Sequence, residues 1–248
     1  MLVDIQAQEC AQLIQEARSI AALTGAGIST NAGIPDFRGP KGLYVTKRYD
    51  PDKVFDIDYF QVDPKPFFDF ARDFISFENQ LAPTIAHDFL AKLEAGGKLS
   101  GVITQNIDSL HQRAGSKKVF EMHGSFLKNF CFRCRKEFFY DEIKARLQNE
   151  PVPHCSCGGV IKPDVIFFGE NVKYLAESSR LAEEVDLFFV IGTSCVVYPA
   201  AMLPTMVKGD IVIVNHDPIH LESSQVALSI QHDIDRFFQI LDDAMGKG

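Results

Sequence analysis

The sequence predicts an α/β protein whose main sheet is parallel and is covered by helices on both faces. Three continuous apolar runs of strand length, at residues 165–168, 187–191 and 211–214, contain no polar side chain. Such runs are typical of parallel strands that are buried on both faces. Small or polar residues follow each run, as expected where functional groups collect beyond the carboxyl ends of the strands.

The first half of the chain supplies further elements in order. Residues 5–17 carry apolar side chains at helical spacing and lead into a small apolar strand at 19–23. Residues 40–66 contain repeated prolines, which indicates loops and short helices. Apolar residues then occur throughout three turns at 67–77, enough for a helix packed on most sides. Residues 83–93 predict an amphipathic helix, which a pair of glycines ends.

Two more strands are expected, at 100–104 and 119–122, before a cysteine-containing segment at about 126–160. With 248 residues the chain is long enough for one large domain with a smaller insert. No apolar stretch reaches 18 residues and no signal-peptide pattern is present, so we expect a cytoplasmic protein without membrane association. A net charge of −8 argues against direct nucleic-acid binding.

A glycine-containing turn follows the first strand. Gly25, Ala26 and Gly27 let the backbone turn sharply and approach a ligand closely, because glycine has no Cβ. A helix that begins at residues 28–29 would direct its free N–H groups at an anion, as α/β sheets do with a dinucleotide pyrophosphate. The usual third glycine and the later acidic residue are missing, so a plain strand-to-helix turn is the alternative.

The next motif, at residues 33–39, places an acid, an aromatic ring and a guanidinium between two glycines. This composition favours a loop that closes over a planar, charged ligand. Arg38 is able to form a bidentate contact with phosphate oxygens, and Phe37 is able to shield a reactive centre from water.

The six cysteines form two classes. Cys10 and Cys195 stand alone among apolar residues and are expected to be inert. Cys131-x-x-Cys134 and Cys155-x-Cys157 are paired, and four thiolates suit a structural, tetrahedral Zn²⁺ with no open position. The second spacer is shorter than usual. A ligand role for the adjacent histidine and metal-free surface thiols are the alternatives.

Two polar groups follow predicted strands. Residues 105–108 include Gln105, Asn106 and Asp108, which taken alone also fit a solvated turn with a helix N-cap. His123 follows the short strand at 119–122, and a lone histidine is more often structural than catalytic.

Together these motifs resemble the sirtuins, a family of NAD-dependent protein deacylases, over essentially the whole chain and bacterial members especially. The order of motifs carries the resemblance: Gly-Ala-Gly-Ile-Ser at 25–29, Gly-Ile-Pro-Asp-Phe-Arg-Gly at 33–39, Thr-Gln-Asn-Ile-Asp at 104–108, His-Gly at 123–124, the paired cysteines, Lys-Pro-Asp-Val and Phe-Gly-Glu within 162–170, and Gly-Thr-Ser at 192–194.

The resemblance implies a Rossmann-like NAD-binding domain formed by residues 1–39, 88–123 and 160–248. Residues 40–87 would form a helical module and residues 124–159 a zinc-binding module, which together make a small domain. The implied cofactors are NAD as co-substrate and structural Zn²⁺. The implied partners are acyl-lysine proteins or peptides, bound by a monomer.

The resemblance also implies roles for individual residues. His123 would be the general base, with Asn106 as a second catalytic residue. The implied cofactor-binding residues are Gly25, Ala26, Gly27, Thr30, Asp36, Phe37, Arg38, Gln105, Ile107, Asp108, Gly192, Thr193, Ser194, Asn215 and Asp233. The implied substrate-binding residues are Val165, Phe168, Gly169 and Val197, and the implied metal ligands are Cys131, Cys134, Cys155 and Cys157.

The implied reaction moves the acyl group from lysine to ADP-ribose and releases nicotinamide and O-acetyl-ADP-ribose. Family members that remove succinyl or malonyl groups carry a Tyr-x-x-Arg pair, which residues 67–72 lack. Acetyl or longer apolar acyl groups are therefore favoured, because a buried carboxylate without a partner is costly. An inward-turned Arg72 would alter this expectation.

Three other functions fit parts of the sequence. A mono-ADP-ribosyltransferase on the same scaffold would use NAD with a protein nucleophile, although an uncharged acyl tunnel argues against it. A non-enzymatic zinc-ribbon protein would bind protein or nucleic acid, which the net charge disfavours. A hydride-transfer dehydrogenase would require a nicotinamide exposed to a second substrate.

Overall fold

The computed structural model describes residues 2–34, 49–78, 81–221 and 223–246. The chain forms two compact units, which we call the sheet unit and the small unit. The sheet unit comprises Met1–Ile34, Ala82–Met122 and Lys173–Gly248, and the small unit comprises Pro35–Leu81 and His123–Val172. The expected ligand loop at 35–39, with Asp36, Phe37 and Arg38, lies outside the described residues.

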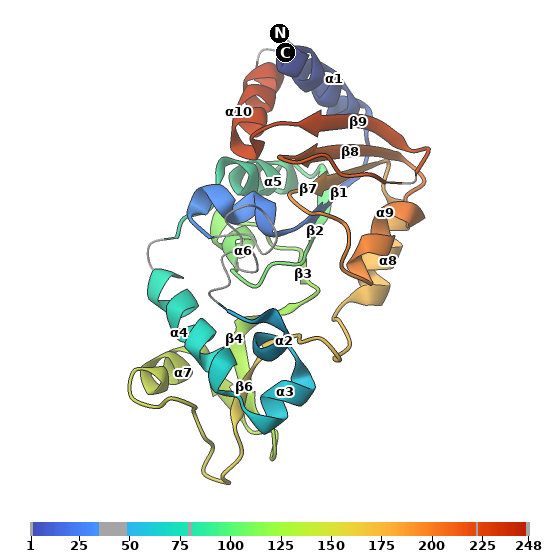
Figure 1. The fold of residues 1–248 in the computed structure, drawn as a ribbon. Coiled ribbons are helices and arrows are strands. Elements are labelled where there is room, and N and C mark those ends of the chain that lie inside the picture. Colours follow the sequence, from blue (N-terminus) through green and yellow to red (C-terminus); the bar gives the residue numbers. More distant parts are fainter. Residues whose placement is uncertain (1, 35–48, 79–80, 222, 247–248) are drawn as a thin grey trace. The chain divides into compact units, whose positions relative to one another are not determined.

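The sheet unit is built on six parallel strands in the order β3-β2-β1-β7-β8-β9 (Figure 1). Every neighbouring pair is parallel, which confirms the predicted fold class. The strands are β1 (Ile20–Thr24), β2 (Leu99–Thr104), β3 (Val119–Glu121), β7 (Leu187–Ile191), β8 (Asp210–Asn215) and β9 (Val226–Gln231).

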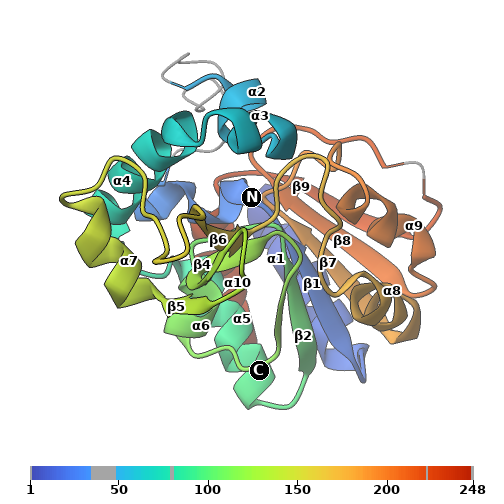
Figure 2. The same ribbon diagram turned by 90° about the horizontal axis from the view of Figure 1, so that it is seen from below.

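Helices cover both faces of this sheet. Figures 1 and 2 show α5 and α10 on one side and α8 and α9 on the other. On the first side α1 joins α5 and α10, and their apolar faces form one buried core with the strands. The helical segments of the unit are α1 (Leu2–Glu16), η1 (Ala26–Ala32), α5 (Ile85–Ala95), α6 (Leu110–Ala114), α8 (Leu175–Glu184), η2 (Ala200–Met202), α9 (Leu203–Met206) and α10 (Ile234–Met245).

The small unit combines helices with a three-stranded antiparallel sheet in the order β5-β4-β6. Its core is a cluster of aromatic rings centred on Phe67, which is fully buried. The ring centroids of Phe67 and Phe167 are 4.9 Å apart. The elements are α2 (Pro51–Val54), α3 (Ile57–Val62), α4 (Lys65–Glu78), β4 (Gly124–Cys131), β5 (Glu137–Phe139), α7 (Tyr140–Leu147) and β6 (Ile161–Val165). The predicted aromatic helix at 67–77 is therefore α4.

Two expectations about strands are corrected. The apolar run 165–168 is not a strand of the parallel sheet, because β6 ends at Val165 and pairs antiparallel with β4. The run is apolar for another reason: Phe167 is buried among the rings of the small unit. The sequence analysis also missed β9, an edge strand whose residues are mostly exposed or half-buried.

None of the helices in the described part of the chain combines the length and apolar character that crossing a bilayer requires.

The turns after β1 and β7 pack backbone against backbone. The amide of Gly27 donates to the carbonyl oxygen of Gly192 at 2.8 Å. A Cβ on Gly27 would lie 2.7 Å from the Cα of Gly192, and a Cβ on Gly192 would collide with the amide nitrogen of Ile28. Gly192 also has φ +59°, a conformation that other residues adopt at a cost.

We therefore expect Gly192→Ala to destabilise the protein by about 2 kcal/mol or more, because strain and collision add. Gly96→Ala is the matched control, since its Cβ would meet nothing closer than 3.5 Å and its φ is −77°. Thermal unfolding of both variants measures the difference. Equal midpoints would show that the close approach of the two turns contributes nothing to stability.

Candidate functional site

A buried hydrogen-bond network lies beyond the carboxyl ends of β1 and β2. The side-chain amide of Asn106 donates to the Gly25 carbonyl oxygen at 3.1 Å and to Ser29 Oγ at 3.2 Å. Ser29 Oγ in turn donates to Asp108 Oδ2 at 2.7 Å, and the amide of Leu110 donates to Asp108 Oδ1 at 2.9 Å. Two segments of the sheet unit, residues 25–29 and 106–110, are thereby fixed around one carboxylate.

The environment of Asp108 sets its electrostatics. Removal from water raises the pKa of this carboxyl, although the hydrogen bonds from Leu110 and Ser29 oppose the shift. A carboxylate that is costly to bury and already accepts two hydrogen bonds has its orientation fixed before any ligand arrives. It offers a preorganised acceptor for an N–H or O–H group.

A second contact joins the ends of β2 and β7. Gln105 Nε2 donates to Thr193 Oγ1 at 2.9 Å, and the amide of Cys195 donates to the same oxygen at 3.2 Å. Together with the Gly27–Gly192 contact, this brings the turns after β1, β2 and β7 into one group. The structure thus gathers seven expected site residues at the carboxyl ends of the parallel strands: Gly25, Gly27, Gln105, Asn106, Asp108, Gly192 and Thr193.

Other expected cofactor residues surround this edge. Thr30 Oγ1 donates to the Gly27 carbonyl oxygen at 3.0 Å within η1. Asp233 caps the N-terminus of α10 by accepting from the Arg236 amide at 2.8 Å, and Asn31 Nδ2 donates to it at 3.3 Å. Asn215 ends β8, where its carbonyl oxygen accepts from the His232 amide. Ala26 and Ile107 are half-buried, and Ser194 is exposed. The expected substrate-binding residue Val197 is half-buried.

The sequence analysis missed a pair of buried histidines beneath η1. His111 Nε2 lies 2.9 Å from Thr24 Oγ1, and His87 Nδ1 lies 2.9 Å from Thr84 Oγ1. The two rings are 4.6 Å apart between centroids. Burial lowers the pKa of His87 to about 4 and that of His111 well below its usual value, so both are neutral at physiological pH.

The histidine pair is linked to η1, because Thr84 Oγ1 donates to the Ile28 carbonyl oxygen at 3.1 Å.

Ser29, which bonds to Asn106 and Asp108, was also not assigned a role from the sequence. The capping-box spacing of Thr84 and His87 was a usable signal, since the structure shows both reciprocal hydrogen bonds at the start of α5.

In the small unit, His123 precedes β4 directly and begins a set of expected catalytic and substrate residues. Its carbonyl oxygen accepts from the Ile166 amide at 2.8 Å, which fixes the backbone at both positions. The backbone of Phe168 pairs with the segment before α3, donating to Phe55 O at 2.7 Å and accepting from Ile57 N at 3.1 Å. The Phe168 side chain is half exposed, and Gly169 has φ +93°.

The four paired cysteines converge on one point. Their Sγ atoms all lie within 4.8 Å of one another, with 3.4 Å between Cys131 and Cys157 and 3.7 Å between Cys134 and Cys155. Tetrahedral zinc with Zn–S bonds of about 2.3 Å places sulfur atoms about 3.8 Å apart. The cluster therefore fits structural zinc despite the short second spacer. The alternative ligand His154 is not part of it, and its Nδ1 lies 2.8 Å from the Val152 carbonyl oxygen.

The remaining cysteines are protected by burial. The pKa of Cys10 is raised to about 12 and that of Cys195 to about 11, mainly because the thiolate form would lose hydration. Both thiols therefore stay protonated near neutral pH, in agreement with their expected inertness.

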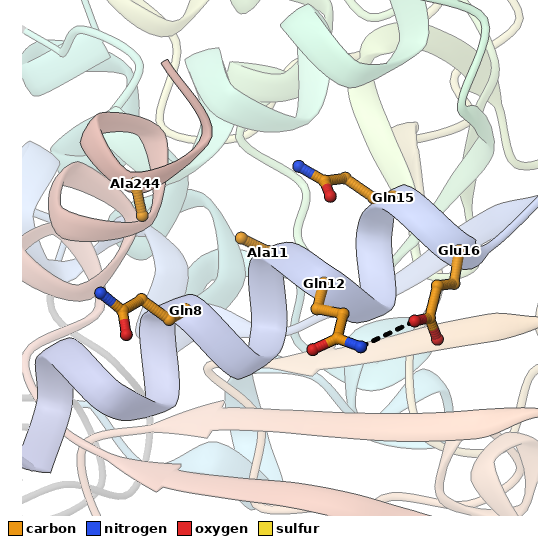
Figure 3. Close-up of a pocket in the computed structure, with 6 residues that line it drawn as sticks. All are labelled: Gln8, Ala11, Gln12, Gln15, Glu16 and Ala244. Atoms are coloured by element: carbon orange, nitrogen blue, oxygen red, sulfur yellow. Dashed lines mark hydrogen bonds between the residues drawn. The ribbon is translucent and has the colours of Figure 1, made fainter. Parts of the chain in front are cut away.

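The outer surface of the sheet unit is hollowed between α1 and α10. This hollow of about 440 Å³ is lined by Gln8, Ala11, Gln12, Gln15, Glu16 and Ala244. Figure 3 shows that its polar side chains come from α1, where Gln12 bonds Glu16 at 2.8 Å. None of the expected site residues lines it.

Comparison with known proteins decides the family. The sequence profile of the Sir2 family matches residues 25–199. The chain belongs to the Sir2 family. A protein from Thermotoga maritima named NAD-dependent protein deacetylase is 47% identical over 214 residues, which cover 84% of this chain and 86% of that protein.

Two solved Sir2 structures share the fold. One is described as Sir2 with a deacetylated p53 peptide and 3′-O-acetyl ADP ribose; it has a TM-score of 0.90, 42% identity, and coverage of 96% of this chain and 98% of the other. The other is described as Sir2 with a p53 peptide and NAD⁺, with a TM-score of 0.88, 41% identity, and coverage of 97% and 98%. Sir2 membership confirms the resemblance seen in the sequence and favours the deacylase interpretation over the alternatives.

For the metal centre of this Sir2 protein, we expect about one Zn²⁺ per chain after purification, measured by elemental analysis. Cys131→Ala is expected to lose the metal and destabilise the small unit, because structural zinc contributes folding energy directly. Cys10→Ala removes a buried thiol far from the cluster in sequence and is the control, with metal content unchanged. Zinc-free wild-type protein of normal stability would contradict the assignment.

Proposed function

We propose that this chain removes acetyl groups from lysine side chains, with NAD as co-substrate and O-acetyl-ADP-ribose and nicotinamide as further products. The observation that carries the proposal is the buried network of Ser29, Asn106 and Asp108 at the edge of the parallel sheet. It occurs in a Sir2 chain that is 47% identical to a protein named NAD-dependent protein deacetylase.

In this proposal the network holds the nicotinamide half of the co-substrate. When bound, NAD would supply the ADP-ribose group, a ribose hydroxyl oxygen of which receives the acyl group as nicotinamide leaves. Asp108, fixed by Ser29 and Leu110, accepts a hydrogen bond from the carboxamide. Asn106 keeps Ser29 and the Gly25 turn in place, and Gln105 with Thr193 borders the ribose.

His123 acts as the general base. Histidine is the side chain best suited to take up a ribose hydroxyl proton near neutral pH. The hydrogen bond from the Ile166 amide to the His123 carbonyl oxygen holds the backbone of His123 in place. Phe37 and Arg38 would cover the reaction centre and bind phosphate, as the sequence implies.

The acyl-lysine peptide is proposed to bind along residues 165–169 by strand addition, with Val197 as a further contact. The aromatic cluster of the small unit makes the surroundings of this segment apolar, because Phe167 packs against Phe67 with 4.9 Å between ring centroids. Arg72 is not available to this environment. Its Nη1 donates to the Pro151 carbonyl oxygen at 2.9 Å, and its Nη2 pairs with Asp69.

A cytoplasmic location also belongs to this proposal. Four converging thiols function as metal ligands only when reduced, and the cytosol keeps cysteines reduced.

Mass spectrometry of an acetyl-lysine peptide incubated with NAD tests the function by detecting O-acetyl-ADP-ribose. We expect His123→Ala to lower turnover by at least about 100-fold while NAD binding is retained, because a general base is removed. His216→Ala is the matched control, since that imidazole is exposed. Near-normal turnover of His123→Ala would exclude the proposed base.

A preference for neutral acyl groups follows from the same environment. Acetyl- and propionyl-lysine peptides are expected to react with at least about tenfold higher kcat/KM than a matched succinyl peptide, because a carboxylate would lose hydration without a cationic partner. Arg72→Lys should leave this ratio unchanged, as its guanidinium is engaged elsewhere. Equal rates on succinyl and acetyl peptides would contradict the apolar assignment.

A further inference from the structure

An ion pair between Lys162 and Glu170 flanks the segment that we propose for peptide binding. The Lys162 side chain is only 1% exposed, and its Nζ lies 2.8 Å from Glu170 Oε2. The same ammonium donates to the Val165 carbonyl oxygen at 2.6 Å and lies 4.0 Å from the ring centre of Phe167. Lys162 therefore directs its charge inward, onto the segment that follows it.

Glu170 closes this segment from the other end. Its Oε2 also accepts from the Phe167 amide at 2.9 Å, while its own amide donates to the Phe167 carbonyl oxygen at 3.0 Å. One carboxylate oxygen thus binds both the lysine and the backbone of the turn. The Lys162 ammonium therefore holds the backbone at Val165, and the Glu170 carboxylate holds it at Phe167.

Phe168 and Gly169 lie between these fixed points. The Phe168 side chain is 50% exposed, whereas the neighbouring Phe167 is 1% exposed. A segment that receives a peptide binds it more tightly when the conformation of the segment is fixed in advance, because less entropy is lost on binding. The Lys162–Glu170 pair constrains this segment through its bonds to Val165 and Phe167.

We propose that Lys162 and Glu170 are positioning residues that hold residues 165–169 in the form that accepts the substrate peptide. This inference rests on the proposed deacetylase function. Neither side chain needs to contact the substrate, because both act through the backbone that they bind. Loss of the pair is expected to weaken peptide binding and to leave NAD use unaffected.

The first test is Lys162→Met. Lys53→Met is the matched control, because Lys53 is exposed and its Nζ lies 3.4 Å from Asp50 Oδ2 in a solvent-exposed ion pair. For Lys162→Met we expect the KM for an acetyl-lysine peptide to rise at least tenfold. The kcat at saturating peptide should stay within threefold and the KM for NAD should not change. Calorimetry with the same peptide should show the same loss of affinity, and the control should behave as wild type.

The second test is Glu170→Gln, which retains an acceptor for the Phe167 amide but removes the negative charge that Glu170 contributes to the ion pair. Because both single changes break the same contact, the double variant K162M/E170Q should raise the peptide KM by less than the product of the two single effects. Effects that multiply would show that the residues act independently and would overturn the proposal.

Other outcomes are equally decisive. An unchanged peptide KM in folded Lys162→Met, or a fall in kcat alone, overturns the positioning role. Circular dichroism and zinc content report folding; if both single variants fail to fold, the pair is structural and the proposal is wrong. If wild-type protein produces no O-acetyl-ADP-ribose, the proposed function fails instead, and calorimetry with the peptide still tests the pair.

Discussion

The candidate cofactor site at the carboxyl ends of β1, β2 and β7 depends on one constraint, the close approach of the turns after β1 and β7. Gly27 and Gly192 touch through their backbones, and neither position has room for a side chain. With the two turns in contact, the end of β2 can reach both: Asn106 bonds to Gly25, and Gln105 bonds to Thr193. A bulkier residue at either glycine would separate the turns and disconnect these amides from their partners.

Much of this arrangement could be predicted from the sequence, because its signals are local. The apolar runs at 187–191 and 211–214 are continuous, and they became β7 and β8 of the parallel sheet. The cysteine spacing predicted a cluster that the structure brings within bonding range of a single ion. The motif order predicted the family, which the match to Sir2 confirms.

The errors have physical reasons as well. Val165 and Phe167 of the run 165–168 are apolar because the small unit buries them, and hydrophobicity alone does not distinguish a sheet strand from a segment packed against aromatic rings. The strand β9 is a short run of mixed apolar and polar residues at the edge of the sheet, without the continuous apolar pattern of β7 and β8. The bond between His111 and Thr24 of β1, and the contact between the rings of His111 and His87, join elements that are separate in sequence, and no local pattern encodes them.

The metal centre changes how the charge of the small unit should be understood. A divalent ion held by four thiolates leaves the cluster with about two net negative charges. Arg133 lies between the first two cysteines, and its Nη1 donates to the carbonyl oxygen of Cys157 at 3.1 Å. That guanidinium places a positive charge beside the anionic complex, whereas Arg135 and Lys136 lie over the rings of Phe130 and Phe138.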